Sequence, residues 1–420
     1  MDTHKQLTIG LFGFGVVGEG LYKVLQQTPS LKASIKKICI KHPGKERNAP
    51  DELFTTDKDI LLNDPEINVI VEVIDDSKAA FEIVSTALRN EKDVVSASKK
   101  MIAENLTALL DLQQQTGRSM LYESAACASI PVIRNLEEYY DNDLLHSIKA
   151  IVNGSTNFIL TKIFEDKLSF KQALLLAQQQ GFAESDPRLD VEGYDAVNKW
   201  TFLLTHAYGI LTSPENILFN GIQHIDASDA LVAKTKDLQI KLVAQAQKLN
   251  SGRVAAFVLP QFVRQDDHLA FVKNEYNGVV IESGFADKQF FYGKGAGSFP
   301  TASAVLSDIS ALRYQYKYEY KKLYHHTPHE LSDNFYLRVY VSFDDLKNVP
   351  RERFEWIEEW YAQEDRKYLV GVVSFQELRN NTWWKENNNS LIVAAEGVIE
   401  DIAIRQLKKK SLELAGIHVN

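Results

Sequence analysis

Cysteine and methionine are scarce in this chain of 420 residues, which holds two cysteines and three methionines. Because Cys39 and Cys127 both lie in apolar sequence, a disulfide framework is excluded and a reducing compartment is indicated. No apolar run approaches the roughly 18 residues of a membrane span, and the first residues lack the layout of a signal peptide. We therefore expect a cytoplasmic protein without a membrane partner.

The chain also lacks an excess of positive charge. Its 47 lysines and arginines face 56 aspartates and glutamates, which gives a net charge of -9. The basic residues are dispersed, and the longest basic run, Lys408 to Lys410, is typical of a solvated helix end. A nucleic-acid partner is therefore not expected.

What the chain does contain is the material of a large globular protein. Hydrophobic residues make up 45% and aromatic residues 10% of the sequence, as in ordinary globular proteins. A chain of this length exceeds one ordinary core, so two or three domains are expected.

The first motif is a glycine-rich turn between a strand and a helix. The apolar run Leu7 to Phe12 ends in Gly13-Phe14-Gly15-Val16-Val17-Gly18, and a helical pattern follows. In this setting Gly13 makes the tight turn, Gly15 admits a pyrophosphate and Gly18 lets the helix pack on the strand. The motif predicts a dinucleotide site, and the alternative is a purely structural turn.

The second expected strand, Ile35 to Ile40, ends without the carboxylate that would bind the ribose 2'-hydroxyl of NAD. Lys41, His42, Lys45 and Arg47 follow instead and could receive a 2'-phosphate. We therefore favour NADP, with NAD as the alternative cofactor and an exposed basic loop without a ligand as the other interpretation.

Three further runs read as strands of the same sheet: Val69 to Ile74, Val94 to Ser96 and Leu121 to Glu123. Their continuous apolar character is typical of a parallel sheet buried on both faces. Lys99 follows one of these strands, at the edge where open α/β sheets bind ligands.

The most informative stretch is an acidic loop that leads into a helix, from Gly181 to Lys199. Asp195 and Lys199 are four residues apart at the start of an apolar helical run, so they share one helix face. The stretch predicts a site with an amine and carboxylates, and the alternative is a solvated ion pair. Its carboxylates are Glu184, Asp186, Asp190, Glu192 and Asp195.

The spacing of this loop resembles the signature of homoserine dehydrogenases. The positions that fall in place are Glu184, Asp186, Pro187, Asp190, Gly193, Asp195 and Lys199. The resemblance implies reduction of L-aspartate 4-semialdehyde to L-homoserine with NAD(P)H, within threonine, methionine and isoleucine biosynthesis. It further covers Asn153 to Asn157 and the glycine segment from Gly293 to Ala302, and so extends over residues 5–318.

The resemblance also implies roles for individual residues. It makes Lys199, Lys99 and Asp195 catalytic, and Glu184, Asp190, Asn153 and Thr156 substrate-binding. A monovalent cation, sodium or potassium, would bind Glu123 and the carbonyls of Ala126, Ala128 and Ile130, although Glu123 reads equally well as a structural carboxylate. The implied cofactor-binding residues are Gly13, Phe14, Gly15, Val16, Val17, Gly18, Lys41, Lys99, Gly295 and Gly297.

The sequence departs from the family pattern at three places. Ser98 replaces an asparagine, Asp75-Asp76 replace two glycines, and Cys127, Ala128 and Ser129 replace a glycine run. Two carboxylates beside a phosphate would repel it, and a non-glycine residue at positive φ would be strained. The departures keep open the alternative of a non-catalytic or regulatory relative acting in subunit assembly. Another NAD(P)-dependent dehydrogenase of small amino acid aldehydes would fit the fold but not the spacing from Glu184 to Lys199.

The last hundred residues alternate between strand and helix patterns. We expect strands at 335–343, 367–375 and 390–397, helices at 352–362 and 399–416, and a short strand at Ile417 to Val419. This βαββα order resembles an ACT domain, but the ligand-binding glycine of such domains is missing from Asp344 to Pro350, so assembly is favoured over amino-acid sensing.

The expected fold is α/β, with a Rossmann-type nucleotide domain, an α+β substrate and dimerisation domain, and a C-terminal ferredoxin-like (ACT-like) domain. The sheets predict a homodimer or homotetramer. The expected ranges are 1–130 for the nucleotide domain, completed by about 295–320, 131–294 for the substrate-binding and catalytic domain, 316–330 for a linker, and 331–420 for the ACT-like domain.

Overall fold

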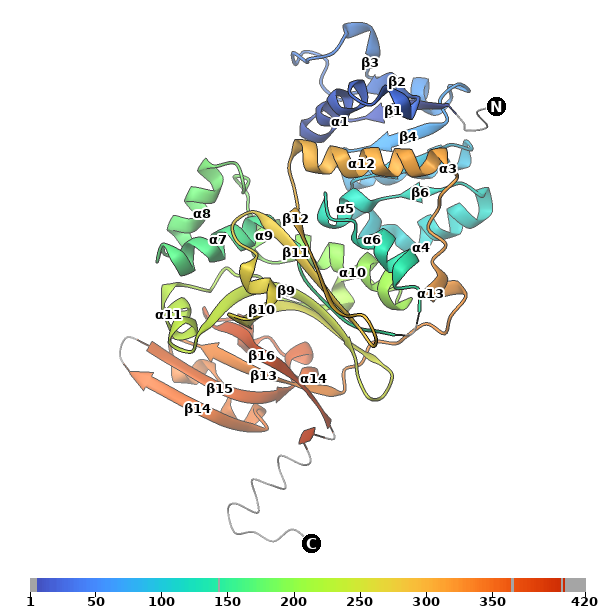
Figure 1. Ribbon diagram of the computed structural model, residues 1–420. Coiled ribbons are helices and arrows are strands. Elements are labelled where there is room, and N and C mark those ends of the chain that lie inside the picture. The colour runs from blue at the N-terminus through green and yellow to red at the C-terminus, as the bar shows by residue number, and fades with distance from the viewer. Residues whose placement is uncertain (1–5, 143, 364–365, 402, 405–420) are drawn as a thin grey trace. The chain divides into compact units, whose positions relative to one another are not determined.

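The computed structural model describes residues 6–142, 144–363, 366–401 and 403–404, and the chain divides into two compact units (Figure 1). Unit 1 comprises Met1–Leu144, Asn198–Pro214 and Phe291–Pro328. Unit 2 comprises Leu145–Val197, Glu215–Phe290 and His329–Asn420. Among the described residues, no helix combines the length and the apolar character needed to cross a membrane.

Unit 1 is built on a parallel sheet, as predicted. Its order is β3-β2-β1-β4-β5-β6, with every neighbouring pair parallel. All four residues of β4 are buried, as expected for a strand covered on both faces. The strands are β1 (Leu7–Phe12), β2 (Ala33–Cys39), β3 (Phe54–Thr55), β4 (Val69–Glu72), β5 (Asp93–Ser96) and β6 (Met120–Leu121).

The helices of unit 1 connect these strands and bring later parts of the chain back to them. α12 (Ser298–Arg313) lies along α1 (Val16–Gln26), so residues from the last third of the chain complete the nucleotide fold (Figure 1). The other helices are α2 (Asp59–Leu62), α3 (Ser77–Arg89), α4 (Lys99–Thr116), α5 (Glu123–Cys127), α6 (Val132–Arg134), the π-helix η3 (Asn135–Tyr139) and α13 (Lys321–Tyr324).

The strand predicted at Leu121 to Glu123 ends earlier than expected, because Glu123 already begins α5. The cause is local. The backbone amide of Glu123 donates to Asp308 Oδ2, and its carboxylate accepts from the amides of Ile133 and Arg134. These bonds turn the chain away from the sheet, and the predicted loop becomes two short helices.

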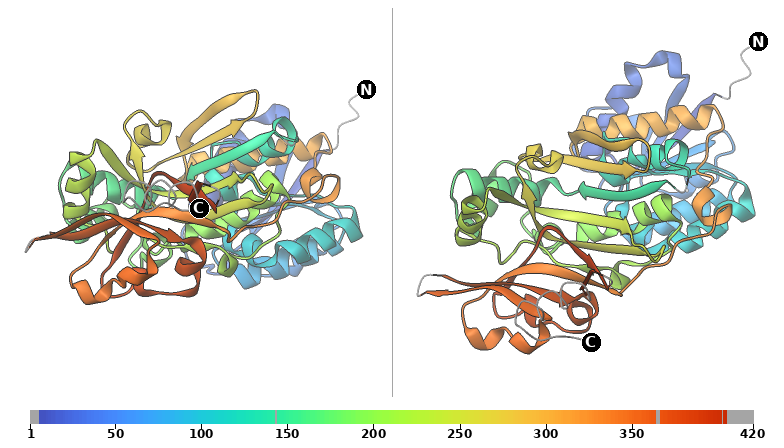
Figure 2. Two further views of the ribbon diagram at one scale, coloured as in Figure 1. Left: turned by 90° about the horizontal axis from the view of Figure 1, so that it is seen from below. Right: turned by 60° about the horizontal axis from the view of Figure 1, so that its bottom comes forward.

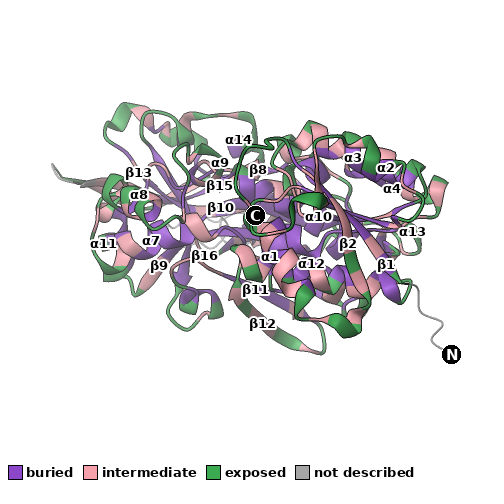
Figure 3. Cartoon of the chain, turned by 90° about the horizontal axis from the view of Figure 1, so that it is seen from above, coloured by how far each residue is buried: buried purple, intermediate pink, exposed green. Residues whose placement is uncertain are grey.

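Unit 2 is a mixed sheet with helices. The sheet has the order β12-β11-β7-β9-β10-β16-β13-β15-β14, and β8 also pairs with β10. β9 and β10 are buried along most of their length (Figure 3). The first elements are β7 (Leu145–Ile151), α7 (Gly154–Glu165), α8 (Phe170–Gln179), α9 (Arg188–Val191), β8 (Leu218–Phe219), α11 (Ala227–Thr235), β9 (Leu238–Lys248), β10 (Val254–Arg264) and β11 (Tyr276–Ser283).

Two elements belong to both units. The helix α10 (Tyr194–Tyr208) begins in unit 2 and ends in unit 1, and so does the strand β12 (Asp287–Lys294). The predicted helix after the acidic loop is thus present, with Asp195 and Lys199 in its first turns.

The C-terminal part of unit 2 joins the same sheet, since β16 pairs with β10 at Val393 and Gln261 and lies beside it (Figure 2). Phe257 of β10 also packs against Phe335 and Phe375. The tail therefore shares its apolar core with the central strands. Its elements are β13 (Phe335–Ser342), β14 (Trp356–Gln363), β15 (Arg366–Ser374), α14 (Phe375–Asn380) and β16 (Ser390–Glu400).

The helix predicted at 352–362 is wrong, because this segment forms β14. Trp356, Ile357 and Trp360 fit the helical period, but they also have high strand propensity, and pairing with β15 decides between the two structures. The helix predicted from Ile399 is also displaced, since Ile399 and Glu400 still belong to β16. The remainder of that helix and the strand at Ile417 to Val419 lie outside the described residues.

Candidate active site

The glycine turn has the geometry that its sequence predicts. Gly13 has φ +96°, and a Cβ on Gly18 would lie 2.2 Å from the carbonyl oxygen of Gly13. A Cβ on Gly15 would meet nothing within 4 Å, so the backbone there is open. Because α1 begins at Val16 without a side-chain cap, its first amides face this opening. The turn therefore fits a pyrophosphate.

The loop after β2 is basic and partly ordered by its own backbone. The guanidinium of Arg47 donates to the carbonyls of His42 and Lys45 and lies 5.4 Å from the ring centroid of Phe54. Lys41 is exposed. The ring of Phe14 also packs edge-on against Phe54. A hollow of about 770 Å³ opens beside this loop and is lined by residues that include Pro43, Lys45, Arg47, Phe54 and Thr56.

A second pocket of unit 1, about 230 Å³ in volume, brings together residues from six separate stretches of sequence. Lys99 and Lys199 both line it, together with Asp75, Gly295 and Gly297. Lys99 is exposed, whereas Lys199 is 6% exposed. The remaining lining residues are Val17, Val73, Ile74, Ala97, Ser124, Ala125, Ala126, Ala296 and Thr301.

The two aspartates after β4 have different surroundings. Asp76 caps α3 by accepting a hydrogen bond from the amide of Ala79. Asp75 instead lines the pocket with the two lysines. Of the two aspartates, only Asp75 therefore lines the pocket and could repel an anion there, and two lysines line the same pocket.

In unit 2, four of the predicted site residues form one hydrogen-bonded group. The amide nitrogen of Asn153 donates to Asp190 at 2.7 Å and to Asp195 at 2.9 Å. The amide oxygen of Asn153 caps α7 by accepting from the backbone N–H of Thr156, and it also accepts from the Thr156 hydroxyl. Asn153 and Asp195 are each 5% exposed. This group gives unit 2 two carboxylates held in fixed positions.

Two other acidic residues of the loop, Glu184 and Asp186, have different surroundings. Glu184 is exposed and is not part of the Asn153 group, although its carbonyl accepts from the side chain of Gln178. Asp186 pairs with Arg188, whose hydrogen bonds lower the pKa of that carboxyl to about 2. Gly193 has φ +89°, which permits the turn into α10.

Two family models match the chain. "Homoserine dehydrogenase, NAD binding domain" covers residues 13–123, and "Homoserine dehydrogenase" covers residues 131–310. The chain belongs to the homoserine dehydrogenase family. Among its relatives, the homoserine dehydrogenase of Bacillus subtilis is 34% identical over 317 residues, or 73% of each chain. That of Synechocystis is 35% identical over 312 residues, or 72% of each chain.

Solved homoserine dehydrogenases have similar structures. The enzyme of Thiobacillus denitrificans has a TM-score of 0.78 at 25% identity, over 93% of this chain and 98% of its own. The S. aureus enzyme at pH 7.5 has a TM-score of 0.70 at 26% identity, over 93% and 98%. A hyperthermophilic archaeal homoserine dehydrogenase in complex with NADPH has a TM-score of 0.63 at 26% identity, over 75% of this chain and 99% of its own.

In this member of the homoserine dehydrogenase family, the carboxylate predicted to bind a cation already accepts hydrogen bonds. Both carboxylate oxygens of Glu123 accept backbone amides, and Arg134 pairs with Asp308 at 2.7 Å. Burial raises the pKa of Glu123 to about 7 and that of Asp308 to about 6. Ala128 has φ +43°, so the strain expected where the family has glycine is present. The described residues contain no group of three or more His, Cys, Asp and Glu side chains that could hold a metal.

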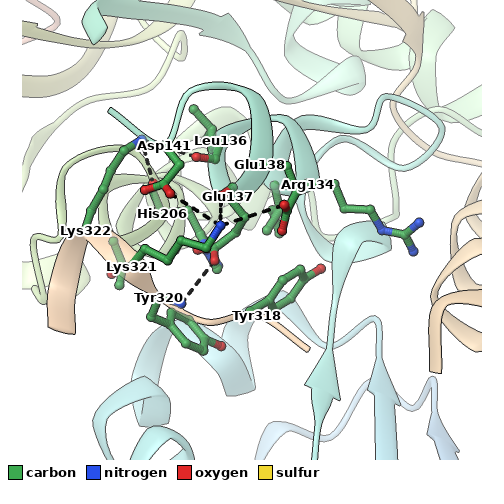
Figure 4. A network of polar contacts seen from close by, with 12 residues as sticks. Arg134, Leu136, Glu137, Glu138, Asp141, His206, Tyr318, Tyr320, Lys321 and Lys322 are labelled. Carbon is green, nitrogen blue, oxygen red and sulfur yellow. Dashed lines mark hydrogen bonds and ion pairs between the residues drawn. The ribbon is translucent and has the colours of Figure 1, made fainter. Parts of the chain in front are cut away.

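The sequence interpretation missed a buried polar network in unit 1 (Figure 4). His206 lies between Glu137 Oε1, at 2.5 Å, and the Tyr122 hydroxyl, at 2.8 Å. The Tyr122 hydroxyl also bonds that of Tyr320 at 3.1 Å, and Lys322 donates to the carbonyl of His206. The segment expected to be a linker is therefore packed against α10. The residues of this network are isolated polar positions in the sequence, so no local pattern predicted that they lie together.

Proposed function

We propose that this homoserine dehydrogenase reduces L-aspartate 4-semialdehyde to L-homoserine with NADPH and oxidises L-homoserine in the reverse direction. The observation that carries the proposal is the pocket lined by Lys99 and Lys199 next to glycine segments that fit a dinucleotide. The bound nicotinamide supplies or accepts the hydride. The protein must then supply a proton to the substrate oxygen and hold the amino acid end.

The two lysines suit the proton transfer. An aldehyde oxygen becomes an alkoxide as hydride arrives, and ammonium groups stabilise and protonate that charge. Lys199 and Lys99 are proposed for these roles. General acid help of this kind contributes on the order of 10²- to 10⁴-fold to the rate.

The carboxylates of unit 2 suit the amino acid end of the substrate. Asp195 is proposed to orient the substrate, with Asn153 and Asp190 keeping its carboxylate in place through their hydrogen bonds. Thr156 supports Asn153. Glu184 is proposed to bind the substrate ammonium, since its exposed carboxylate is available to a ligand. The Asn153 group supports the role of Asp195, and the exposure of Glu184 supports the role of that residue.

The cofactor assignment rests on the basic loop after β2 and on the glycine turn. NADP is proposed over NAD, because the loop after β2 carries Lys41 and Arg47, which could receive a 2'-phosphate, and the end of β2 lacks the carboxylate that would bind a ribose 2'-hydroxyl. A sodium or potassium ion at Glu123 and the carbonyls of Ala126, Ala128 and Ile130 stays a prediction. Its test is turnover in sodium or potassium compared with tetramethylammonium.

The tail is proposed as an ACT-like assembly domain. Its strands are antiparallel in the order β16-β13-β15-β14, with β15 between the first strand and β14, which supports a split βαβ unit. Two 3₁₀ turns, η6 (Leu346–Asn348) and η7 (Arg351–Arg353), stand where such a unit has its first helix. A homodimer or homotetramer in the cytoplasm is proposed on this basis and on the sequence.

The experiment that tests the proposed function is homoserine-dependent reduction of NADP and of NAD by the purified protein, followed at 340 nm. Turnover that requires homoserine and prefers NADP supports the proposal. If the protein binds NADPH but does not turn over homoserine, the alternative of a non-catalytic relative is favoured. Turnover with another small amino alcohol, but not with homoserine, would show that the proposed substrate is wrong and that the proposed class of reaction is right.

A further inference from the structure

Glu72 is a buried carboxylate inside the parallel sheet of unit 1, and the mechanism above does not use it. It is the last residue of β4 and is 0% exposed. A carboxyl group in such a place costs stability unless it is hydrogen-bonded, and an apolar residue would fill the strand at lower cost. The hydrogen bonds of Glu72 show which parts of the chain this carboxylate connects.

The carboxylate of Glu72 ties together two loops. Its Oε1 accepts the backbone amide of Ile74 at 2.7 Å, in the loop after β4. Its Oε2 accepts the hydroxyl of Ser96 at 2.6 Å, at the end of β5. Glu72 and Ser96 are paired positions of neighbouring parallel strands, so these bonds cross between the strands at the edge where the sheet binds ligands.

The Ser96 hydroxyl also bonds the residue that precedes α4. Its oxygen accepts the amide of Ser98 at 3.1 Å, and α4 begins at the next residue, Lys99. The backbone adds a parallel bond, since the amide of Ala97 donates to the carbonyl of Glu72. Two side-chain hydrogen bonds thus connect Glu72 through Ser96 to Ser98, the residue before Lys99.

Both loops held in this way line the pocket of the two lysines. Val73, Ile74 and Asp75 come from the loop after β4, Ala97 comes from the loop after β5, and Lys99 is the first residue of α4. A change in the distance between the loops would therefore move Lys99 relative to Lys199 and would reshape the wall of the pocket.

We propose that Glu72 is a positioning residue, which acts through Ser96 and the Ile74 amide to fix the two loops and hence the ammonium of Lys99. The inference rests on the proposed function. Burial raises the pKa of Glu72 to about 7, against the opposing effect of its hydrogen bonds. The buried carboxyl group of Glu72 therefore costs stability, as expected of a residue that is retained because it fixes local geometry.

The test compares Glu72→Ala, Glu72→Gln and Ser96→Ala with wild type. Three quantities are measured: kcat for homoserine oxidation per folded molecule, the Kd for NADPH by fluorescence titration, and the thermal midpoint. Asp229→Asn is the matched control, because Asp229 is also a fully buried carboxyl with a raised pKa, of about 6, but lies in unit 2 on α11.

We expect Glu72→Ala to lower kcat by about ten-fold or more, because a misplacement near 1 Å at a reacting group has effects of this order. Its Kd for NADPH should rise as well. Glu72→Gln should recover most of kcat, since its amide oxygen can still accept from Ile74 and its nitrogen can donate to Ser96. Ser96→Ala should lower kcat less than Glu72→Ala does, and the double variant should be no worse than Glu72→Ala alone.

A purely structural role gives a different result. Glu72→Ala would then lower the thermal midpoint, while kcat per folded molecule and the Kd for NADPH stayed at wild-type values, and the proposal would be overturned. If Glu72→Ala does not fold, wild-type values of both quantities in Ser96→Ala, which removes the hydroxyl that bonds Glu72, overturn it equally. Absence of homoserine turnover in the wild type counts against the proposed function alone, because the NADPH titration still tests Glu72.

Discussion

Two lysines of the chain, Lys199 and Lys100, have very different surroundings. Lys199 is 6% exposed and lines the pocket, four residues after Asp195 on α10. Lys100 is exposed and lies 3.7 Å from Glu104 one helical turn away. An exposed pair of that kind contributes little to stability. A largely buried lysine at a pocket wall has the character of a functional group.

Lys199→Ala should therefore lower kcat by roughly 100-fold or more, because the proton donor to the developing alkoxide is lost. NADPH affinity should change little. Initial rates and a fluorescence titration separate the two effects, with Lys100→Ala as the control that keeps wild-type turnover. Near-normal kcat in Lys199→Ala would make the residue structural.

The preference between cofactors can be tested at Lys41. Because Arg47 already donates to the carbonyls of His42 and Lys45, its removal would disturb the loop, whereas Lys41 is exposed and can be changed alone. Lys41→Asp should lower the ratio of kcat/KM for NADP over NAD by about ten-fold, as expected for the loss of a charged hydrogen bond. An unchanged ratio would exclude Lys41 from the 2'-phosphate site.

Asp229 gives a prediction for stability against pH. Burial is the main cause that raises the pKa of this carboxyl from 3.8 to about 6, and the Tyr340 hydroxyl donates to it. Since the folded pKa lies above the unfolded one, the unfolded chain ionises first as the pH rises, and the folded state loses stability between about pH 4 and pH 7. The shift corresponds to about 3 kcal/mol.

Asp229→Asn cannot ionise, so its stability relative to wild type should improve as the pH rises through that window. Thermal midpoints of both proteins at about pH 4 and about pH 7.5 measure the change. A difference between the two proteins that is independent of pH would show that Asp229 ionises normally in the fold.

At the scale of elements, the glycine turn before α1 separates folding from binding. A Cβ at position 18 would collide with the carbonyl of Gly13, whereas a Cβ at position 15 would meet no protein atom. Gly18→Ala should therefore lower the thermal midpoint of the protein without cofactor. Gly15→Ala should leave that midpoint unchanged and weaken NADPH binding, because the side chain occupies the space of the pyrophosphate.

Calorimetry without ligand and an NADPH titration distinguish the two variants. If Gly15→Ala binds NADPH as the wild type does, the dinucleotide does not approach this turn. If Gly18→Ala is as stable as the wild type, the packing of α1 on β1 must be looser than the structure shows.

Elements with one dominant signal could be predicted from the sequence. β1, α1 and α10 follow from an apolar run, a glycine turn and a helical period, and the turn from Asn153 to Asn157 follows from its place between a strand and a helix. β14 could not, because Trp356 and Trp360 suit either structure and the pairing with β15 is a long-range contact. The Asn153 group joins residues about forty positions apart, which no local pattern reveals.

At the scale of the whole molecule, the structure decides at which residue the tail can be removed without disturbing unit 1. The segment before His329 packs in unit 1, where Tyr320 bonds Tyr122 and Lys322 donates to the carbonyls of Leu136 and His206. A cut after Tyr318 would remove these contacts. A cut after Pro328 would keep them, together with every residue that lines the pocket of the two lysines.

We therefore expect the chain truncated after Pro328 to retain detectable homoserine oxidation, and the chain truncated after Tyr318 to lose it with its fold. The longer truncate should nevertheless have a lower thermal midpoint, because Phe257 and Leu259 of β10 lose the tail side chains that cover them. Light scattering should show a smaller oligomer if the tail mediates assembly. L-threonine should inhibit neither the full chain nor the truncate through this domain. Inhibition of the full chain that disappears in the truncate would instead make the tail a sensor, with ligand bound near Asp344 to Pro350 in spite of the missing glycine.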